Sequence, residues 1–175
     1  MKTVPTLYTD RCMLSEVIQK DIPVLRQIMD DAETKKFLPE LCQEFQTQES
    51  LYQFIASFDI YLKQDDGVLW GIHKNEVLIG FIAIMDITAT PTLFYAMHAD
   101  CRNRGYMKEA IITTLQFTKE VDLCRIIQTE VYCDNVISDR LLTNLNFKWY
   151  KQEDKKVYYV INLNKINNSY NNQSK

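Results

Sequence analysis

Positive charge, a glycine and the start of a helix coincide in one stretch of the sequence. Arg102 and Arg104 flank Gly105 after an apolar, strand-like run over residues 93–97, and a helical pattern follows as far as Glu120. The first four backbone N–H groups of a helix have no partner inside it, and together with the helix dipole they attract anions such as pyrophosphate. This order of elements predicts a phosphate-binding loop, with an ordinary connecting loop as the alternative.

A second group of polar residues accompanies the next strand-like run. Glu130 lies within that run, residues 125–132, and Asn135 and Ser138 stand at the start of a helical pattern over residues 136–145. A carboxylate can accept a proton from an amine, and a hydroxyl can donate to a leaving group. The structural alternatives are a solvent-facing carboxylate for Glu130 and helix capping for Asn135 and Ser138.

Metal chemistry is not indicated. The chain has five cysteines and two histidines, and no two cysteines form a Cys-x-x-Cys pair. Structural zinc sites take four such ligands, usually in closely spaced pairs. An odd number of cysteines without a secretory signal favours free thiols in a reducing compartment.

Composition is that of one soluble globular domain. The chain has 175 residues, of which 46% are hydrophobic and 25% charged, and this length suits a single core. The net charge of −3 creates no strong field toward nucleic acid or anionic membranes. No apolar run approaches the ~18 residues of a membrane span, and the N-terminus lacks the apolar core of a signal peptide. We expect a cytoplasmic monomer or homodimer that binds neither nucleic acid nor membrane.

Hydrophobic periodicity predicts alternating strands and helices. Helices are expected after Asp21, after Thr47, after Gly105 and over residues 136–145, whereas strands are expected over residues 9–18, 68–73, 77–87, 93–97, 125–132, 147–151 and 157–163. Such a mixture packs into one layered α/β structure. We therefore expect a single domain over residues 1–163, followed by a polar, Asn-rich tail over residues 164–175.

Three segments resemble the GNAT N-acetyltransferases. The segment beginning Arg102-x-x-Gly105-x-Met107 resembles the Arg/Gln-x-x-Gly-x-Gly/Ala motif of that family, which holds the pyrophosphate of acetyl-CoA. Residues 135–147 are similar to the later Asn-x-x-Ser/Ala…Leu-Gly-Phe element. Residues 9–14 are similar to the opening strand of the branch that contains the ribosomal-protein N-terminal acetyltransferases, the RimJ/RimL-like branch. The resemblance extends from about residue 9 to about residue 163.

The resemblance implies a fold and a cosubstrate. The expected architecture is the GNAT acyl-CoA N-acyltransferase fold, an α/β (α+β) domain with helices on both faces of a mixed, mostly antiparallel sheet of six or seven strands. Its fourth and fifth strands run parallel and splay apart, and acetyl-CoA enters the gap. The cofactor-binding loop would then consist of Arg102, Asn103, Arg104, Gly105, Tyr106 and Met107.

Two further cofactor contacts follow from the resemblance. A bulge near Phe94 and Tyr95 would free backbone N–H groups of Ala96 and Met97 to face the thioester oxygen, since a bulge re-aims backbone donors. Asn135 would either hydrogen-bond the pantetheine or cap the following helix.

Departures from the family pattern leave alternatives open. Met107 stands where a small residue is usual, so its side chain either turns into the core or marks a looser or lost cofactor site. Asn103 stands where Gly is usual, a tolerant position. Leu142 replaces a tyrosine acid and Asn146 replaces a glycine, although Asn tolerates the left-handed geometry that ends a helix.

Catalysis needs a neutral amine and a stabilised thiolate. Glu130 is the candidate base, and Ser138 is the candidate donor to the leaving sulfur. Glu109 is expected to support the loop and the helix dipole. A rival arrangement pairs Cys133 as nucleophile with His98 as base, against which stands the ordinary inert cysteine.

These features predict an acetyl-CoA-dependent N-acetyltransferase that acts on a primary amine. The opening strand and the Asn135/Ser138 pattern without the tyrosine favour the α-amine of a protein or peptide N-terminus as acceptor. One alternative is a small-molecule acetyltransferase acting on a polyamine, amino acid or antibiotic. Another is a catalytically weak CoA-binding domain, suggested by Met107, Leu142 and Asn146.

Overall fold

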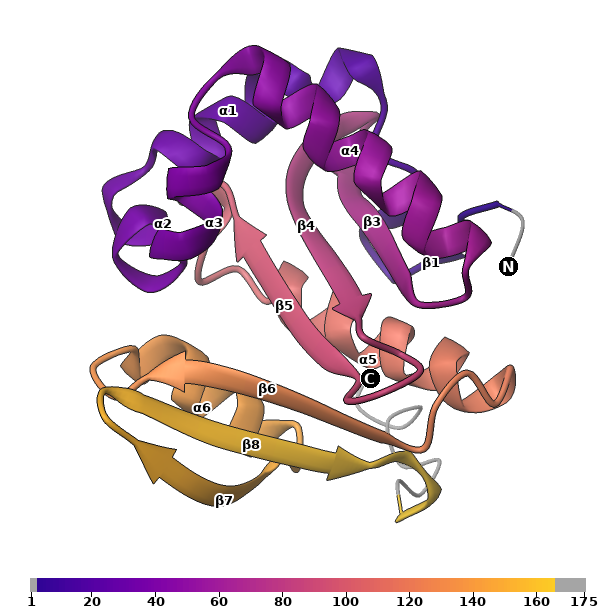
Figure 1. Cartoon of the computed structure of the whole chain (residues 1–175), viewed down its shortest axis with the longest axis vertical. Coiled ribbons are helices and arrows are strands. Elements are labelled where there is room, and N and C mark those ends of the chain that lie inside the picture. The colour runs from indigo at the N-terminus through magenta and orange to yellow at the C-terminus, as the bar shows by residue number, and fades with distance from the viewer. Residues whose placement is uncertain (1–2, 166–175) are drawn as a thin grey trace.

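The computed structural model describes residues 3–165, which form one mixed sheet with helices packed on both of its faces (Figure 1). The strands are β1 (Leu7–Tyr8), β2 (Met13–Ser15), β3 (Gly67–Lys74), β4 (Val77–Met85), β5 (Thr92–Met97), β6 (Ile126–Tyr132), β7 (Lys148–Glu153) and β8 (Lys156–Asn162). The helices are α1 (Ile22–Asp30), α2 (Ala32–Phe37), α3 (Pro39–Glu44), α4 (Gln48–Lys63), α5 (Tyr106–Glu120) and α6 (Val136–Asn144). Short 3₁₀ helices cover Gln19–Asp21, Ala99–Cys101 and Leu163–Lys165. The expected α/β fold class is confirmed.

The sheet has eight strands in the order β1-β2-β3-β4-β5-β6-β8-β7, where six or seven were expected. The additional strand is β1, which lies before the first expected strand, and only Met13–Ser15 of the expected residues 9–18 is a strand. Thr9 Oγ1 accepts hydrogen bonds from the N–H groups of Arg11 and Cys12 and so forms a turn. Leu7 then pairs with Leu14, and Tyr8 with Met13, as a short hairpin.

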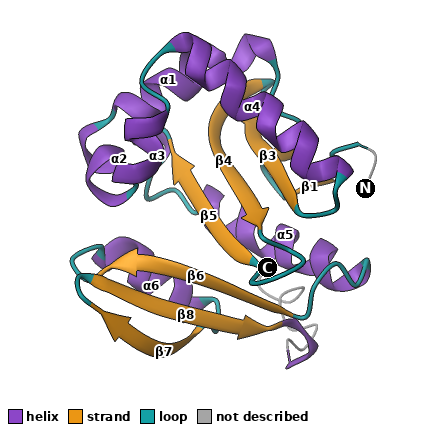
Figure 2. Cartoon of the chain, viewed as in Figure 1, coloured by secondary structure: helices purple, strands orange, loops and turns teal. Residues whose placement is uncertain are grey.

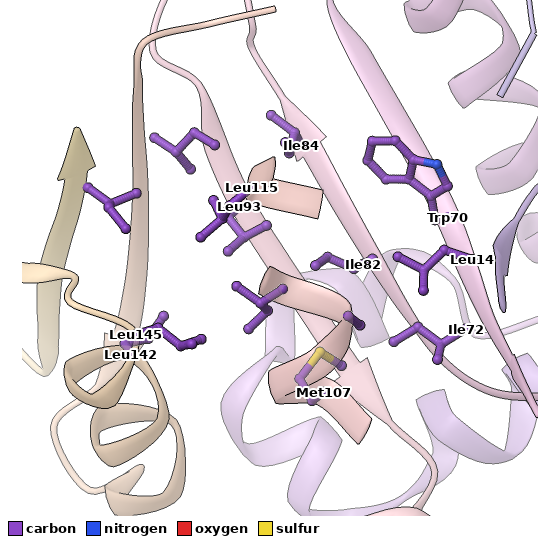
Figure 3. Close-up of a cluster of buried hydrophobic side chains, with 14 of the residues drawn as sticks. Leu14, Trp70, Ile72, Ile82, Ile84, Leu93, Met107, Leu115, Leu142 and Leu145 are labelled. Atoms are coloured by element: carbon purple, nitrogen blue, oxygen red, sulfur yellow. The ribbon is translucent and has the colours of Figure 1, made fainter. Parts of the chain in front are cut away.

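Two layers of apolar side chains meet at the central strand β4. Phe81 and Ala83 on one face belong to the cluster of buried residues from α1 and α4. Ile82 and Ile84 on the other face pack with α5, α6 and β3 (Figure 3). β4 is therefore buried on both faces, which agrees with its almost continuous apolar sequence.

The fourth and fifth expected strands are β5 and β6, and they splay apart as predicted. They run parallel and share one paired position, Thr92 with Gln128, where Gln128 N–H donates to Pro91 O at 2.7 Å. β5 pairs with β4 along its whole length, and β6 pairs likewise with β8. The two halves of the sheet consequently diverge beyond Thr92 (Figure 2).

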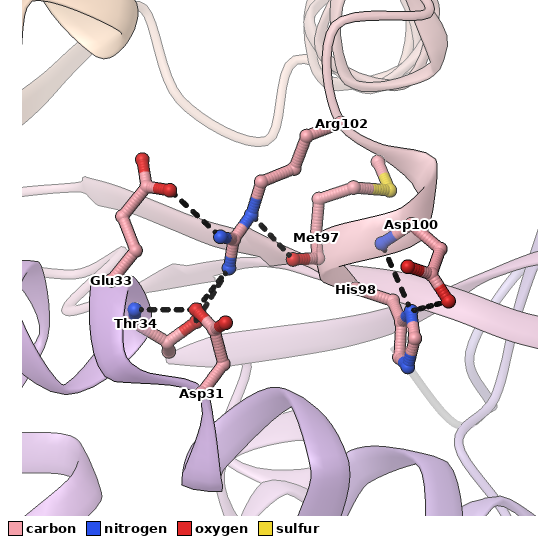
Figure 4. A network of polar contacts seen from close by, with 7 residues as sticks. All are labelled: Asp31, Glu33, Thr34, Met97, His98, Asp100 and Arg102. Atoms are coloured by element: carbon pink, nitrogen blue, oxygen red, sulfur yellow. Dashed lines mark hydrogen bonds and ion pairs between the residues drawn. The ribbon is translucent and has the colours of Figure 1, made fainter.

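Arg102, just before α5, ties the cofactor-loop segment to α2 (Figure 4). Its Nη2 donates to Asp31 Oδ2 at 2.5 Å and to Thr34 Oγ1 at 3.0 Å, and its Nη1 donates to Glu33 Oε2 at 2.8 Å. Its Nε donates to Met97 O at 3.1 Å. Asp31 also accepts from Thr34 N–H and thereby caps α2. One guanidinium thus joins the end of β5 to the start of α2.

Most of the expected tail, residues 164–175, lies outside the described residues. Leu163 is fully buried, and its N–H donates to Arg125 O at 2.9 Å, so the chain is anchored to the end of β6 as far as this point. No helix within residues 3–165 combines the length and apolarity that crossing a membrane requires.

The Arg102 network predicts a pH-dependent contribution to stability. Burial alone would raise the pKa of Asp31, but hydrogen bonds from Arg102 and Thr34 outweigh burial and hold that pKa below its ordinary value. A carboxylate with a lowered pKa in the folded state stabilises the fold above its unfolded value of about 3.9, and this contribution is lost as pH falls through the lower folded value.

We expect Asp31→Asn to cost about 2 kcal/mol near neutral pH, because it removes a charge-assisted hydrogen bond. That loss corresponds to a fall of roughly 4–8 °C in melting temperature for a chain of this size. The matched control is Asp30→Asn, whose half-exposed carboxylate pairs with Lys35 and Arg26 and should matter little. The measurement is the melting temperature of wild type, Asp31→Asn and Asp30→Asn as a function of pH, from acid to neutral. Equal melting temperatures for wild type and Asp31→Asn at neutral pH would contradict the prediction.

Candidate active site

A cavity of about 440 Å³ passes through the sheet where β5 and β6 separate. It is lined on one side by the loop before α5 and by the start of α6, and on the other by α2 and the start of α3. The expected site residues that line it are Ala96, Met97, Arg102, Asn103, Gly105, Tyr106, Met107, Glu130, Asn135 and Ser138. Arg104 does not line it. Within residues 3–165 no cluster of His, Cys, Asp and Glu could hold a metal ion.

Backbone donors of β5 face the gap, although the bulge expected near Phe94 and Tyr95 is absent. The register between β4 and β5 is regular, and His98 N–H donates to Ile79 O at 2.8 Å. Hydrogen bonding alternates along an antiparallel strand, so the N–H of Ala96 also points toward β4. The N–H groups of Tyr95 and Met97 therefore point into the gap. Of the two N–H groups expected to be free of β4, that of Met97 points into the gap and that of Ala96 points toward β4.

The loop before α5 has the backbone shape that its sequence predicted. Gly105 adopts a left-handed conformation at φ 84°, and a Cβ there would also lie 3.0 Å from the Arg11 guanidinium. Asn103, at φ 58°, is left-handed as well, which Asn tolerates. The first N–H groups of α5 are consequently presented at the cavity, where Tyr106, Met107 and Lys108 line the wall. This geometry suits a pyrophosphate group.

Arg11 supports this loop from beneath, a contact that sequence reasoning missed. Its Nη2 donates to Arg104 O at 2.7 Å, and its Nε donates to Glu109 Oε1 at 2.7 Å. Its guanidinium also lies over the Tyr106 ring, 4.4 Å from the centroid. Glu109 accepts a further hydrogen bond from Thr9 Oγ1, so the predicted supporting role of Glu109 is confirmed. The signal was available in the opening segment, which was interpreted only as a strand.

The side chains of Arg102 and Met107 both contact the protein itself. The Arg102 guanidinium donates to Met97 O, Asp31, Glu33 and Thr34, so it positions the loop. Met107 is 9% exposed and belongs to the core cluster (Figure 3). The first of its two predicted alternatives, insertion into the core, is confirmed.

At the start of α6, Asn135 acts as the cap. Its Oδ1 accepts a hydrogen bond from Ser138 N–H at 3.1 Å, which leaves the Ser138 hydroxyl free of the capping role considered for it. That hydroxyl lies beside Tyr95 on the cavity wall. Leu142 is fully buried in the core and does not line the cavity. Asn146 adopts the left-handed geometry expected after the helix, at φ 64°.

The carboxylate of Glu130, the candidate base, forms an ion pair with Lys156. Lys156 Nζ lies 2.5 Å from Glu130 Oε1 and 3.3 Å from Glu40 Oε1. Burial alone would lower the pKa of Lys156, but the two carboxylates outweigh it and raise that pKa above its ordinary value. Lys156 therefore stays charged, and the Glu130 oxygen is occupied by an ammonium group.

The alternative nucleophile and base do not meet. Cys133 is exposed, and Gln152 Nε2 donates to its Sγ at 3.4 Å. His98 Nε2 lies 3.1 Å from Gln27 Oε1. Neither residue lines the cavity, so the structure does not support this pair as the catalytic centre.

Comparison with known proteins agrees with this geometry. The model of the acetyltransferase (GNAT) domain matches residues 11–148, and no curated protein matches the chain by sequence. RimL, a ribosomal L7/L12 alpha-N-protein acetyltransferase solved with coenzyme A, has a TM-score of 0.81 at 13% identity and covers 90% of this chain and 98% of its own.

Two further solved structures share the fold. RimJ of Mycobacterium smegmatis, solved with a CoA disulfide, has a TM-score of 0.75 at 13% identity, covering 90% of this chain and 87% of its own. MccE, a microcin C7 self-immunity acetyltransferase solved with acetyl-CoA and AMP, has a TM-score of 0.72 at 14% identity, covering 87% and 93%. The family match and this fold identify the chain as a member of the GNAT acetyltransferase family, with acetyl-CoA as its cosubstrate.

Proposed function

We propose that the protein transfers the acetyl group of acetyl-CoA to the α-amine of a peptide or protein N-terminus. The observation that carries the choice of acceptor is that every carboxylate lining the cavity is ion-paired. Glu33 binds Arg102, whereas Glu40 and Glu130 share Lys156. An α-amine titrates near ~8 and is partly neutral at physiological pH, whereas a lysine-like amine titrates near ~10. A cavity whose carboxylates are all occupied suits the acceptor that needs no strong base.

The two ends of the cavity fit the two substrates. The loop of Gly105 and the start of α5 would hold the pyrophosphate, and the thioester would reach the gap between β5 and β6. The N–H groups of Tyr95 and Met97, which point into that gap, would donate to the oxyanion that forms as the amine attacks. The amine would enter from the side of α2 and α3, where the wall includes Phe37 and Leu38.

Structural neighbours bear on the acceptor without deciding it. RimL is described as an alpha-N-protein acetyltransferase, which supports an N-terminal α-amine. MccE was solved with acetyl-CoA and AMP, which supports a small-molecule acceptor as the second candidate. Within the second candidate, a polyamine differs from an N-terminal α-amine in the basicity of its amine, so pH dependence separates these two acceptors.

Acetyl-CoA should stabilise the fold through the Gly105 loop. A ligand present at about 100 times its Kd adds about 2.7 kcal/mol, so melting should rise by several degrees with millimolar acetyl-CoA. Gly105→Ala should reduce this shift, because the position is left-handed and a Cβ meets Arg11. No shift for wild type, together with no heat in titration calorimetry, would contradict cofactor binding.

The acceptor prediction concerns rates as a function of pH. With a short peptide that begins with Ala or Ser, kcat/KM should rise with an apparent pKa near that of the free α-amine, and Glu130→Gln should cost less than about threefold. Glu153→Gln is the matched control, because Glu153 pairs with Lys151 outside the cavity. Spermidine should be a poor substrate. Faster turnover of spermidine, lost in Glu130→Gln, would move the protein to the small-molecule class.

A further inference from the structure

One buried hydroxyl in the cavity lacks a protein hydrogen bond of normal geometry. Among the buried side-chain polar atoms of the chain from residue 3 to 165, the hydroxyls of Tyr95 and Thr114 lack a hydrogen bond of normal geometry. Thr114 belongs to α5 and does not line the cavity, whereas Tyr95 does. Buried polar groups in folded proteins are nearly always satisfied. An unsatisfied hydroxyl at a substrate cavity therefore points to a partner that arrives with the substrate.

The other tyrosines that line the cavity are already engaged. The Tyr106 hydroxyl accepts a hydrogen bond from Lys74 Nζ at 2.5 Å. Tyr132 interacts with Glu40 through its hydroxyl, and its ring lies 6.4 Å from that of Phe37. Tyr95 differs from these two tyrosines because its hydroxyl adjoins the neutral hydroxyl of Ser138 and no charged group, so it can still donate to a ligand.

The position of Tyr95 assigns it to the reacting end of the cavity. It belongs to β5 just beyond the point where β5 and β6 separate, and its own N–H points into the gap. Its hydroxyl lies beside Ser138 at the start of α6. Leu142, which stands at the family's usual tyrosine position, is buried in the core. In this chain the tyrosine that lies near Ser138 instead comes from β5.

We propose that the Tyr95 hydroxyl donates a hydrogen bond to the sulfur of CoA as the thioester breaks, with Ser138 as the adjoining hydroxyl that orients it. This inference rests on the proposed acetyl transfer. In that step the amine nitrogen forms a bond to the acetyl carbon, the carbon–sulfur bond breaks, and its electron pair stays on sulfur. The amine proton leaves to water.

Tyr95 keeps its own proton throughout. Burial raises the pKa of Tyr95 to about 12, with Ser138 offsetting part of the rise. A CoA thiol resembles a Cys thiol, with a pKa of about 8.5, so a thiolate is too weak a base to deprotonate this phenol. Tyr95 acts as a neutral donor that stabilises the developing negative charge on sulfur.

Tyr95→Phe tests this role by removing the hydroxyl alone. The fold should melt at the same or a higher temperature, because the lost group makes no protein hydrogen bond of normal geometry. In the same variant kcat should fall about tenfold or more, while KM for acetyl-CoA stays within about threefold. Tyr150→Phe is the control, since its hydroxyl donates to Gln128 outside the cavity and should leave kcat unchanged. A kcat loss accompanied by a large drop in melting temperature would assign Tyr95 a structural role and overturn the proposal.

A comparison of two ligands in wild type and Tyr95→Phe tests whether the Tyr95 hydroxyl contacts the sulfur. Calorimetry would compare CoA with desulfo-CoA at a pH above the thiol pKa of about 8.5. Wild type should prefer CoA by about tenfold, and this preference should shrink to about threefold or less in Tyr95→Phe. An equal preference in both proteins would overturn the Tyr95 proposal while leaving the proposed function intact. No binding of CoA by wild type would overturn both.

Discussion

The separation of β5 from β6 after the single pair of Thr92 with Gln128 is the constraint on which the site depends. Each strand is held in place by its other neighbour, β4 or β8, so the gap does not close. Backbone N–H groups that face the gap have lost the partner that a continuous sheet would supply, and buried donors of this kind need one. A bound thioester can provide it, which makes the cavity a consequence of strand geometry before any side chain is considered.

Charged side chains around the gap connect the elements that line it. Arg102 joins the loop to α2, Arg11 supports the start of α5, and Lys156 connects β8 with β6 and α3. Each of these cations has carboxylate partners. In the mechanism that we propose, the groups that meet the thioester are the backbone N–H groups of β5 and the hydroxyls of Tyr95 and Ser138. Such donors stabilise developing charge without a proton transfer of their own.

Local patterns were sufficient to predict much of the fold. Thr47 caps α4 through Ser50 N–H, and Asn75 with Glu76 turns the β3–β4 hairpin with both residues left-handed, because these features depend only on neighbouring residues. The strand predicted over residues 77–87 is present as β4. The first strand was predicted less well, since apolar spacing did not reveal that the Thr9 hydroxyl would form a turn within it.

The sequence by itself determined the glycine loop before α5, the helix starts and the order of elements, because each follows from the conformational preference of a few adjacent residues. Only the tertiary structure decided which side chains meet. Arg102 finds Asp31 across 71 residues, and Lys156 finds Glu40 across 116, so neither pairing can be inferred from spacing. Asp31 caps α2, so Arg102 anchors the loop to that helix. Glu130, the expected base, is ion-paired with Lys156 of the neighbouring strand β8, which also contacts Glu40 of α3.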